Sequence, residues 1–83
     1  MKVTVLFFSV LREIAGTDRL EWPLDDEGLA TVGELVAALE ACYPGLEGWQ
    51  GRLLLAVNGE YADRATRIAA GDEVALMPPV QGG

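Results

Sequence analysis

The sequence contains no histidine and one cysteine, Cys42, and its 13 acidic residues outnumber the six basic ones. The lack of histidine and of further cysteines excludes most zinc sites and the Ser/His and Cys/His arrangements of nucleophilic catalysis. A single cysteine also excludes a disulfide within the chain. The formal net charge of −7 repels a phosphate backbone, so we expect no nucleic-acid partner and favour a basic protein surface. We do not expect the side chains of this protein to perform catalysis.

Long apolar runs are also missing. No stretch approaches the roughly 20 residues that cross a bilayer, and the first residues lack the basic and apolar segments of a signal peptide. With the lone Cys42, these absences predict a cytoplasmic protein with no membrane partner. The composition, 51% apolar and 23% charged, is ordinary for a folded chain of one domain. We expect a folded domain over residues 1–79 and a flexible tail over residues 80–83.

Two strands are expected near the start of the chain. Residues 3–8 are apolar at both odd and even positions, which is typical of a central strand in contact on both faces. One face of this strand carries Val3, Val5 and Phe7, and the other carries Thr4, Leu6 and Phe8. Residues 19–24 alternate polar and apolar, which indicates a half-exposed strand, and Pro23 restricts its end to an edge of the sheet.

A short helical turn and an acidic loop lie on either side of the second strand. Residues 10–15 predict the helical turn, with Leu11 and Ile14 pointing inward. Gly16 ends it, because glycine readily adopts the left-handed conformation found after helices. The acidic residues 25–28 are expected to be a solvated loop, since a calcium site needs more oxygen ligands at set spacing.

The strongest local signal is the start of a helix at Thr31. Residues 31–34 match a capping box, in which the Thr31 hydroxyl and the Glu34 carboxylate each accept a hydrogen bond from the other residue's amide. Apolar residues then follow at helical spacing and predict one buried stripe: Val32, Leu35, Val36, Leu39 and Cys42. Glu34 and Glu40 are expected off this stripe, and Cys42 is expected to be a small buried hydrophobe. Residues 43–45 end the helix.

The second half of the chain predicts a hairpin and a last strand. Residues 53–62 form the hairpin, because Asn58-Gly59 tolerates the positive φ values of a type I′ turn. The return over residues 64–70 is expected to be irregular. Gly71-Asp72 then turns the chain into a last apolar strand at residues 73–77.

These elements predict an α+β fold. A mixed sheet of about five strands carries one main helix on one face, and the first and last strands are parallel neighbours at its centre. This arrangement accounts for the two most apolar strands, since central parallel strands are covered most. The predicted architecture is the β-grasp, or ubiquitin-like, fold.

The last residues, Pro78-Pro79-Val80-Gln81-Gly82-Gly83, differ from the rest of the chain. The two prolines cannot donate to a sheet and hold φ near −65°, so they end the strand and direct the chain outward. Gly82 and Gly83 have no side chains, which lets their backbone enter a narrow active site. The Gly-Gly pair taken alone is equally consistent with a frayed terminus.

Several short motifs together resemble the MoaD family, the small subunit of molybdopterin synthase, over essentially the whole chain. They are Leu6-Phe7-Phe8, Leu11-Arg12-Glu13 with Gly16, Val57-Asn58, Gly71-Asp72-Glu73-Val74 and the Pro-Pro-Val-x-Gly-Gly ending. The resemblance implies that a MoeB-like activating enzyme uses ATP to adenylate the Gly83 carboxylate. A sulfur donor protein then supplies the sulfur that gives a thiocarboxylate. A MoaE-like large subunit, which holds the active site, uses this sulfur to make the dithiolene of molybdopterin.

The resemblance also implies which residues form the site. Gly83 carries the reactive group, with Gly82 before it, and the chain itself is a carrier that binds no cofactor beyond the adenylate or thiocarboxylate on Gly83. The expected partner-binding residues are Phe8, Arg12, Tyr61, Met77, Pro78, Pro79, Val80 and Gln81. Strand alternation independently points Phe8 and Met77 outward if Val5 and Phe7 face the helix. From the residues alone, Phe8 and Met77 could instead belong to the core, and Tyr61 could fill a sheet edge.

Three functions therefore compete. The first is the sulfur carrier of molybdenum cofactor biosynthesis. The second is a protein modifier, in which the activated glycine is joined to a target lysine, or a sulfur carrier of another pathway. Lys2 is the only lysine, so branched self-chains are scarcely available to a modifier. The third is a β-grasp binding module whose tail is incidental.

Overall fold

The computed structural model describes residues 2–24, 30–49 and 51–79. Its elements are β1 (Lys2–Phe7), α1 (Val10–Ala15), β2 (Arg19–Pro23), β3 (Ala30–Thr31), α2 (Val32–Cys42), the 3₁₀ helix η1 (Pro44–Trp49), β4 (Leu54–Val57), β5 (Glu60–Ala62), β6 (Arg67–Ile68) and β7 (Glu73–Met77). The loop expected at residues 25–28 and the tail expected at residues 80–83 lie outside the described residues. No helix in the described ranges is long and apolar enough to cross a membrane.

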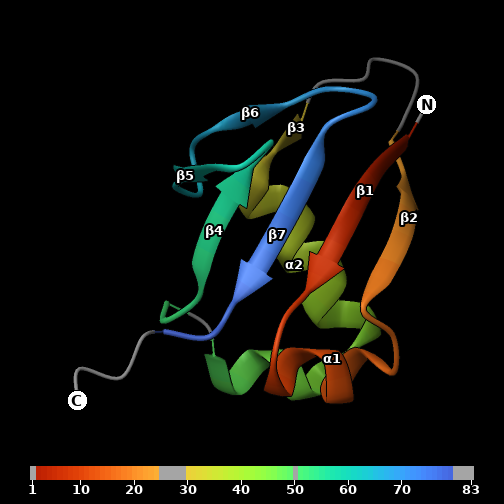
Figure 1. Cartoon of the computed structure of the whole chain (residues 1–83), viewed down its shortest axis with the longest axis vertical. Helices are drawn as coiled ribbons and strands as arrows, with labels where there is room; N and C mark the ends of the chain where they lie inside the picture. The colour runs from red at the N-terminus through yellow and green to blue at the C-terminus, as the bar shows by residue number, and fades with distance from the viewer. Residues whose placement is uncertain (1, 25–29, 50, 80–83) are drawn as a thin grey trace.

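Five strands form one sheet in the order β2-β1-β7-β4-β5. β1 and β7 are parallel, and the pairs β1–β2, β4–β7 and β4–β5 are antiparallel. Helix α2 lies behind this sheet in Figure 1, and no helix of the described residues covers the opposite face. This confirms the predicted β-grasp fold, with the first and last strands as parallel neighbours inside a mixed sheet.

Alternation along β1 and β7 divides the sheet into a core face and an open face. Val3, Val5 and Phe7 are almost fully buried, and in the register Val5 pairs with Val74 and Phe7 with Leu76, which are also buried. Burying one such side chain is worth roughly 1.5–3 kcal/mol, so this face fixes which way β1 and β7 point. The residues between them necessarily face away from α2.

Helix α2 begins as predicted at a capping box. The Thr31 hydroxyl accepts a hydrogen bond from the Glu34 amide at 3.2 Å, and Glu34 Oε1 accepts one from the Thr31 amide at 2.9 Å. Four residues of the predicted stripe are buried against the sheet: Val32, Leu35, Val36 and Leu39. The expected turn residue Gly16 also has the left-handed conformation, with φ 78°, and it ends α1.

Two predictions about the burial of α2 residues are wrong. Cys42 is exposed rather than buried, and Glu40 is buried rather than off the stripe, with 8% of its surface exposed. Cys42 is the last residue of α2, and the next residue, Tyr43, packs its ring edge-on against Phe7 with 6.0 Å between centroids. Cys42 is the last residue of the predicted stripe and Glu40 lies beside it, so contacts with other elements decide their burial, and helical spacing alone does not report these contacts.

The predicted irregular return contains a strand pair that the sequence analysis missed. β6 (Arg67–Ile68) pairs antiparallel with β3 (Ala30–Thr31), and Ile68 is 1% exposed. Two residues are too few to show a period of two, because strand patterns need at least four positions. This pair holds the start of α2 against the segment that follows β5.

The hairpin turn is also fastened to the start of β7. Asn58 and Gly59 have φ values of 52° and 86°, which confirms the predicted type I′ turn. The Asn58 Nδ2 donates to Asp72 Oδ1 at 3.0 Å, and its Oδ1 accepts from the Glu73 amide at 2.9 Å. Asp72 Oδ2 in turn accepts from the Ala69 amide at 2.8 Å. One amide side chain thus links two turns that are adjacent only in space.

This link predicts the effect of Asn58→Ala and Asn58→Gly on stability. Alanine removes both side-chain hydrogen bonds and must also adopt a positive φ, so the free energy of unfolding should fall by about 2–3 kcal/mol. Glycine loses the same bonds but tolerates the backbone, so its loss should be smaller, about 1–2 kcal/mol. Urea denaturation measures both values, and equal stability of Asn58→Ala and the unchanged protein would contradict this account.

Candidate functional site

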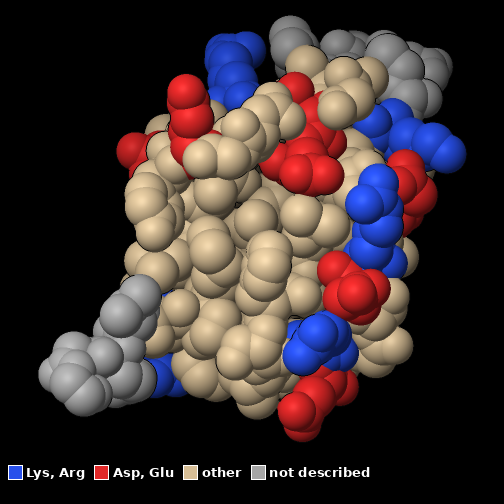
Figure 2. Space-filling view, viewed as in Figure 1, with Lys and Arg blue, Asp and Glu red and all other residues tan. Residues whose placement is uncertain are grey.

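The open face of the sheet carries exposed apolar and aromatic side chains. Phe8, which follows β1, is 45% exposed, and Tyr61 on β5 is 79% exposed. Met77, the last residue of β7, is partly exposed on the same face. In the space-filling view of this face, uncharged residues cover the centre and charged residues lie toward the edges (Figure 2). Large aromatic side chains gathered on an exposed face mark a contact surface more often than isolated ones do.

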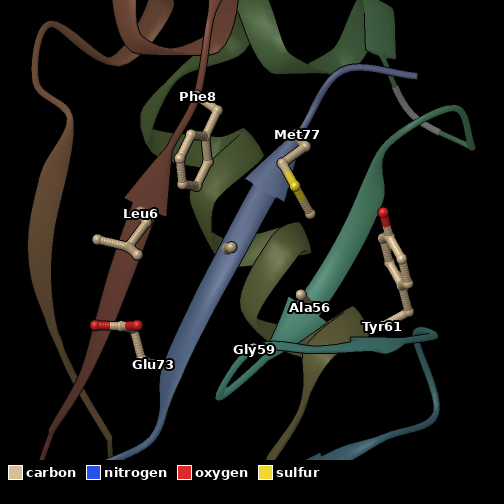
Figure 3. Close-up of a pocket in the computed structure, with 8 residues that line it drawn as sticks. Leu6, Phe8, Ala56, Gly59, Tyr61, Glu73 and Met77 are labelled. Carbon is tan, nitrogen blue, oxygen red and sulfur yellow. The ribbon is translucent and has the colours of Figure 1, made fainter. Parts of the chain in front are cut away.

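This surface is hollowed into a pocket of about 330 Å³, here called the sheet-face pocket. Its lining residues are Leu6, Phe8, Ala56, Gly59, Tyr61, Glu73, Ala75 and Met77. Phe8 and Met77 lie toward one end, at the carboxyl end of β7, and Glu73 lies toward the other (Figure 3). Tyr61 stands at the β5 side, across β4 from Met77.

Strand register explains why the pocket is here. Ala75 pairs with Leu6 on one side and with Ala56 on the other, and Ala56 pairs with Tyr61. Two alanines therefore lie side by side at the centre of the face, with larger side chains around them. Directly paired positions bring side chains on one face within about 5 Å, so small residues here leave a hollow between large neighbours.

The structure brings three of the expected partner-binding residues together. Phe8, Tyr61 and Met77 come from separate parts of the chain, and all three line the sheet-face pocket. Phe8 is exposed rather than part of the core, as strand alternation predicted. Whether these residues bind a partner stays a prediction at this point.

The other expected site residues lie outside the pocket or outside the described residues. Arg12 is exposed on α1 and does not line the pocket. Pro78 and Pro79 follow Met77 directly and are partly buried. Val80, Gln81, Gly82 and Gly83 lie outside the described residues. The chain therefore leaves β7 at the edge of the pocket, since Met77 belongs both to the pocket and to the end of that strand.

Ala56 and Glu73 line the pocket but were not among the expected site residues. A two-residue turn at Asn58-Gly59 places Ala56 opposite Tyr61, so the register of the hairpin identifies Ala56 as a neighbour of Tyr61 on this face. Alternation back from Met77 finds Glu73, two positions before Ala75. The first signal requires the register of the hairpin, and the second requires only the alternation of side chains along β7.

Charge around the site is asymmetric. Glu73 is the only acidic or basic residue among those lining the pocket. At the β1–β2 edge, Lys2 Nζ lies 3.9 Å from Glu21 Oε1, and the Thr4 hydroxyl donates to Glu21 Oε2 at 3.0 Å. The lining thus offers an apolar concave surface, one phenol and one carboxylate, which suits binding rather than bond making.

A mixed five-strand sheet with parallel β1 and β7 and one helix across its core face defines a ubiquitin-like β-grasp protein. The chain belongs to the ThiS family, whose model matches residues 5–83.

Two curated relatives match along their whole length. The chain is 35% identical over 85 residues to the molybdopterin synthase sulfur carrier subunit of Chlamydomonas reinhardtii, with 100% of both chains covered. It is 34% identical over 98 residues to small archaeal modifier protein 3 of Haloferax volcanii, again with 100% of both covered. The MoaD resemblance is confirmed as membership of this family, whose relatives are named both as carriers and as modifiers.

Two solved structures show the same fold. The crystal structure of SAMP1 from Haloferax volcanii has a TM-score of 0.84 and 35% sequence identity, with 100% of both chains covered. A protein–protein complex of subunits 1 and 2 of the molybdopterin-converting factor from Helicobacter pylori contains a chain with a TM-score of 0.70 and 30% identity, also with 100% of both covered.

The adjacent residues Phe7 and Phe8 give a direct test of the two faces. Phe8→Asp should remain folded and lose about 1 kcal/mol or less, because its ring is already 45% exposed. Phe7→Asp should fail to fold, since it places a carboxylate in the core where Phe7 is 2% exposed. Circular dichroism with urea denaturation measures both, and the same outcome for the two variants would contradict the assignment of faces.

Proposed function

We propose that this protein is the sulfur-carrier small subunit of a molybdopterin synthase. The observation that carries the proposal is that the sheet-face pocket ends at Met77, where the chain continues into Pro78-Pro79 and the Gly82-Gly83 sequence. A protein that docks on the pocket therefore lies beside the start of this segment. Family membership and the full-length similarity to a named carrier subunit support the proposal.

The proposed chemistry takes place at Gly83. A carboxylate is a poor electrophile, so the activating enzyme uses ATP to join a Gly83 carboxylate oxygen to AMP and releases pyrophosphate. The acyl carbon then carries a good leaving group: sulfide-level sulfur delivered by a donor protein attacks it, the carbon–sulfur bond forms, and AMP leaves. The resulting thiocarboxylate donates its sulfur to the dithiolene of molybdopterin in the active site of the large subunit. The chain itself supplies the acyl group and binds no cofactor.

The residues of the folded body supply the binding energy for this chemistry. Ordering residues 80–83 in a partner's channel costs on the order of 1–2 kcal/mol per residue in backbone entropy. Burial of Phe8, Tyr61 and Met77 against the partner offsets this cost, because aromatic and methionine side chains at the centre of an interface contribute most. Arg12, exposed on α1, is proposed as an additional charged contact.

The remaining chain segments position Gly83. Pro78 and Pro79 restrict φ and lack an N–H, so they limit the directions in which the chain leaves β7. The six residues after Met77 reach at most about 20 Å, which limits how far the partner's active site lies from the pocket. Val80 and Gln81 are proposed to contact the partner's channel, and Gly82 to let the backbone pass closely.

A second function has specific support. The similarity to a small archaeal modifier protein favours a modifier, in which the activated Gly83 forms an isopeptide bond with a target lysine. The partner-binding surface is the same in both cases, so the structure of the body does not separate them. Adducts of higher mass that disappear when Gly83 is removed would indicate the modifier. A non-carrier binding module would instead keep its function after removal of Gly82 and Gly83.

Intact mass spectrometry tests the proposed carrier function. Incubation with the activating enzyme of the same organism, ATP and a sulfur donor should add a mass equal to the replacement of one oxygen by sulfur. The variant that lacks Gly83 serves as the control and should not show this gain. Repeated absence of the gain, with an enzyme that forms the adenylate on another carrier, contradicts the proposal.

A second experiment tests the role of the pocket in docking. Phe8→Asp should weaken binding to the large subunit by at least about 100-fold, because it places a carboxylate at the centre of an apolar contact. Val10→Asp is the matched control, since Val10 is 37% exposed but does not line the pocket. Isothermal titration calorimetry measures both affinities, and an equal loss in the two variants would show that docking occurs elsewhere.

A further inference from the structure

Glu73 stands out among the residues that line the sheet-face pocket. It is the first residue of β7 and shares the open face with Ala75 and Met77, because alternate residues of a strand face the same way. Its carboxylate lies at the end of the pocket away from Met77 (Figure 3). The pocket therefore has an aromatic and thioether end, formed by Phe8 and Met77, and an anionic end.

The Glu73 backbone is held firmly while its carboxylate has no protein partner in the described part of the chain. The Glu73 amide donates to Asn58 Oδ1 at 2.9 Å, and the Asn58 amide donates to the Glu73 carbonyl at 2.8 Å. No hydrogen bond or ion pair joins its side-chain oxygens to another described residue, and the residue is exposed. A carboxylate on a fixed backbone at the end of an apolar pocket is well placed to receive a donor from outside.

Basic groups near this end of the face do not neutralise Glu73. Thr4 lies opposite Glu73 in the register, and its hydroxyl donates to Glu21, so the neighbouring position adds a second carboxylate. Lys2 Nζ lies 3.9 Å from that second carboxylate, so Lys2 is paired with Glu21. Figure 2 shows acidic side chains over the start of β7, beside the uncharged centre of the face. The local charge favours a cationic group from a partner.

We propose that the sheet-face pocket receives one arginine side chain of the protein that docks on it, with the guanidinium on the Glu73 carboxylate. This proposal rests on the proposed carrier function and specifies the chemistry of its partner. The arginine methylenes lie over Ala75 and Ala56, the two paired alanines at the centre of the pocket. A long apolar stem with a charged head matches a pocket whose walls are apolar and whose far end is anionic.

Arginine fits this pocket better than lysine does. Its planar guanidinium is less strongly hydrated than an ammonium group and donates two parallel hydrogen bonds to one carboxylate. Glu73 and Ala75 are two residues apart, about 7 Å along the strand, a span that an extended arginine side chain covers.

This contact gives the docked partner a defined orientation. Apolar burial around Phe8 and Met77 is non-directional, so it permits rotation of the partner on the face. Glu73 lies four residues from Met77, about 13 Å along β7, and a charged contact there fixes the rotation. A fixed rotation places the partner's active site in line with the segment that follows Pro79.

The test compares Glu73→Gln with Glu60→Gln. Glu60 precedes Tyr61 on β5, so its side chain points to the other face, and the two variants change the net charge equally. Binding to the large synthase subunit of the same organism is measured by isothermal titration calorimetry at low and at physiological salt. Glu73→Gln should weaken binding about tenfold and reduce its salt dependence, whereas Glu60→Gln should remain within about twofold of the unchanged protein.

A charge exchange identifies the arginine itself. Glu73→Arg should weaken binding further, and one Arg→Glu variant of the large subunit should restore it. Equal affinities of Glu73→Gln and Glu60→Gln, or no restoring variant, overturn the proposal. Thiocarboxylate formation on the unchanged protein distinguishes failure of the arginine contact from failure of the carrier function. If it forms normally while the Glu73 and Glu60 variants bind alike, the carrier function stands and the arginine contact is rejected; if it never forms, both are rejected.

Discussion

Parallel pairing of β1 with β7 is the constraint on which the rest of this structure depends. Once Val5 and Val74 face α2, alternation sends Leu6 and Ala75 to the opposite face, and no element of the described chain covers them. The same pairing therefore builds the hydrophobic core and leaves an apolar surface exposed. It also makes the last strand a central one, so that the chain leaves the sheet from the middle of that surface instead of from an edge.

Much of this arrangement could be predicted from sequence, because its signals are local. The outward direction of Phe8 follows from alternation, and the start of α2 follows from the spacing of Thr31 and Glu34. The burial of Glu40 and the exposure of Cys42 could not be predicted, since Glu40 lies beside the helical stripe, Cys42 lies at its end, and neighbouring elements decide the environment of both. The β3–β6 pair is too short to show a pattern. The Ala56 position in the pocket required the register between strands, which spacing within one strand does not supply, whereas the face of Glu73 follows from alternation along β7.

The sheet-face pocket has the properties of a docking surface. Large side chains surround two paired alanines, one carboxylate lies at one end, and Met77 joins the pocket to the final segment of the chain. Binding and reactivity are thus separated along β7: the strand presents the surface, and the proposed reactive carboxylate follows it. In the proposed function, such a separation lets one body serve the activating enzyme and the large subunit in turn, because both can use the same surface.

Tandem mass spectrometry of the protein isolated from its own cells, during molybdopterin synthesis, tests the central claim most directly. The account predicts sulfur in place of one oxygen on the C-terminal fragment that contains Gly83, and no such change elsewhere in the chain. An unmodified Gly83 carboxylate under these conditions, or Gly83 found only in isopeptide linkage to lysines of other proteins, would contradict it.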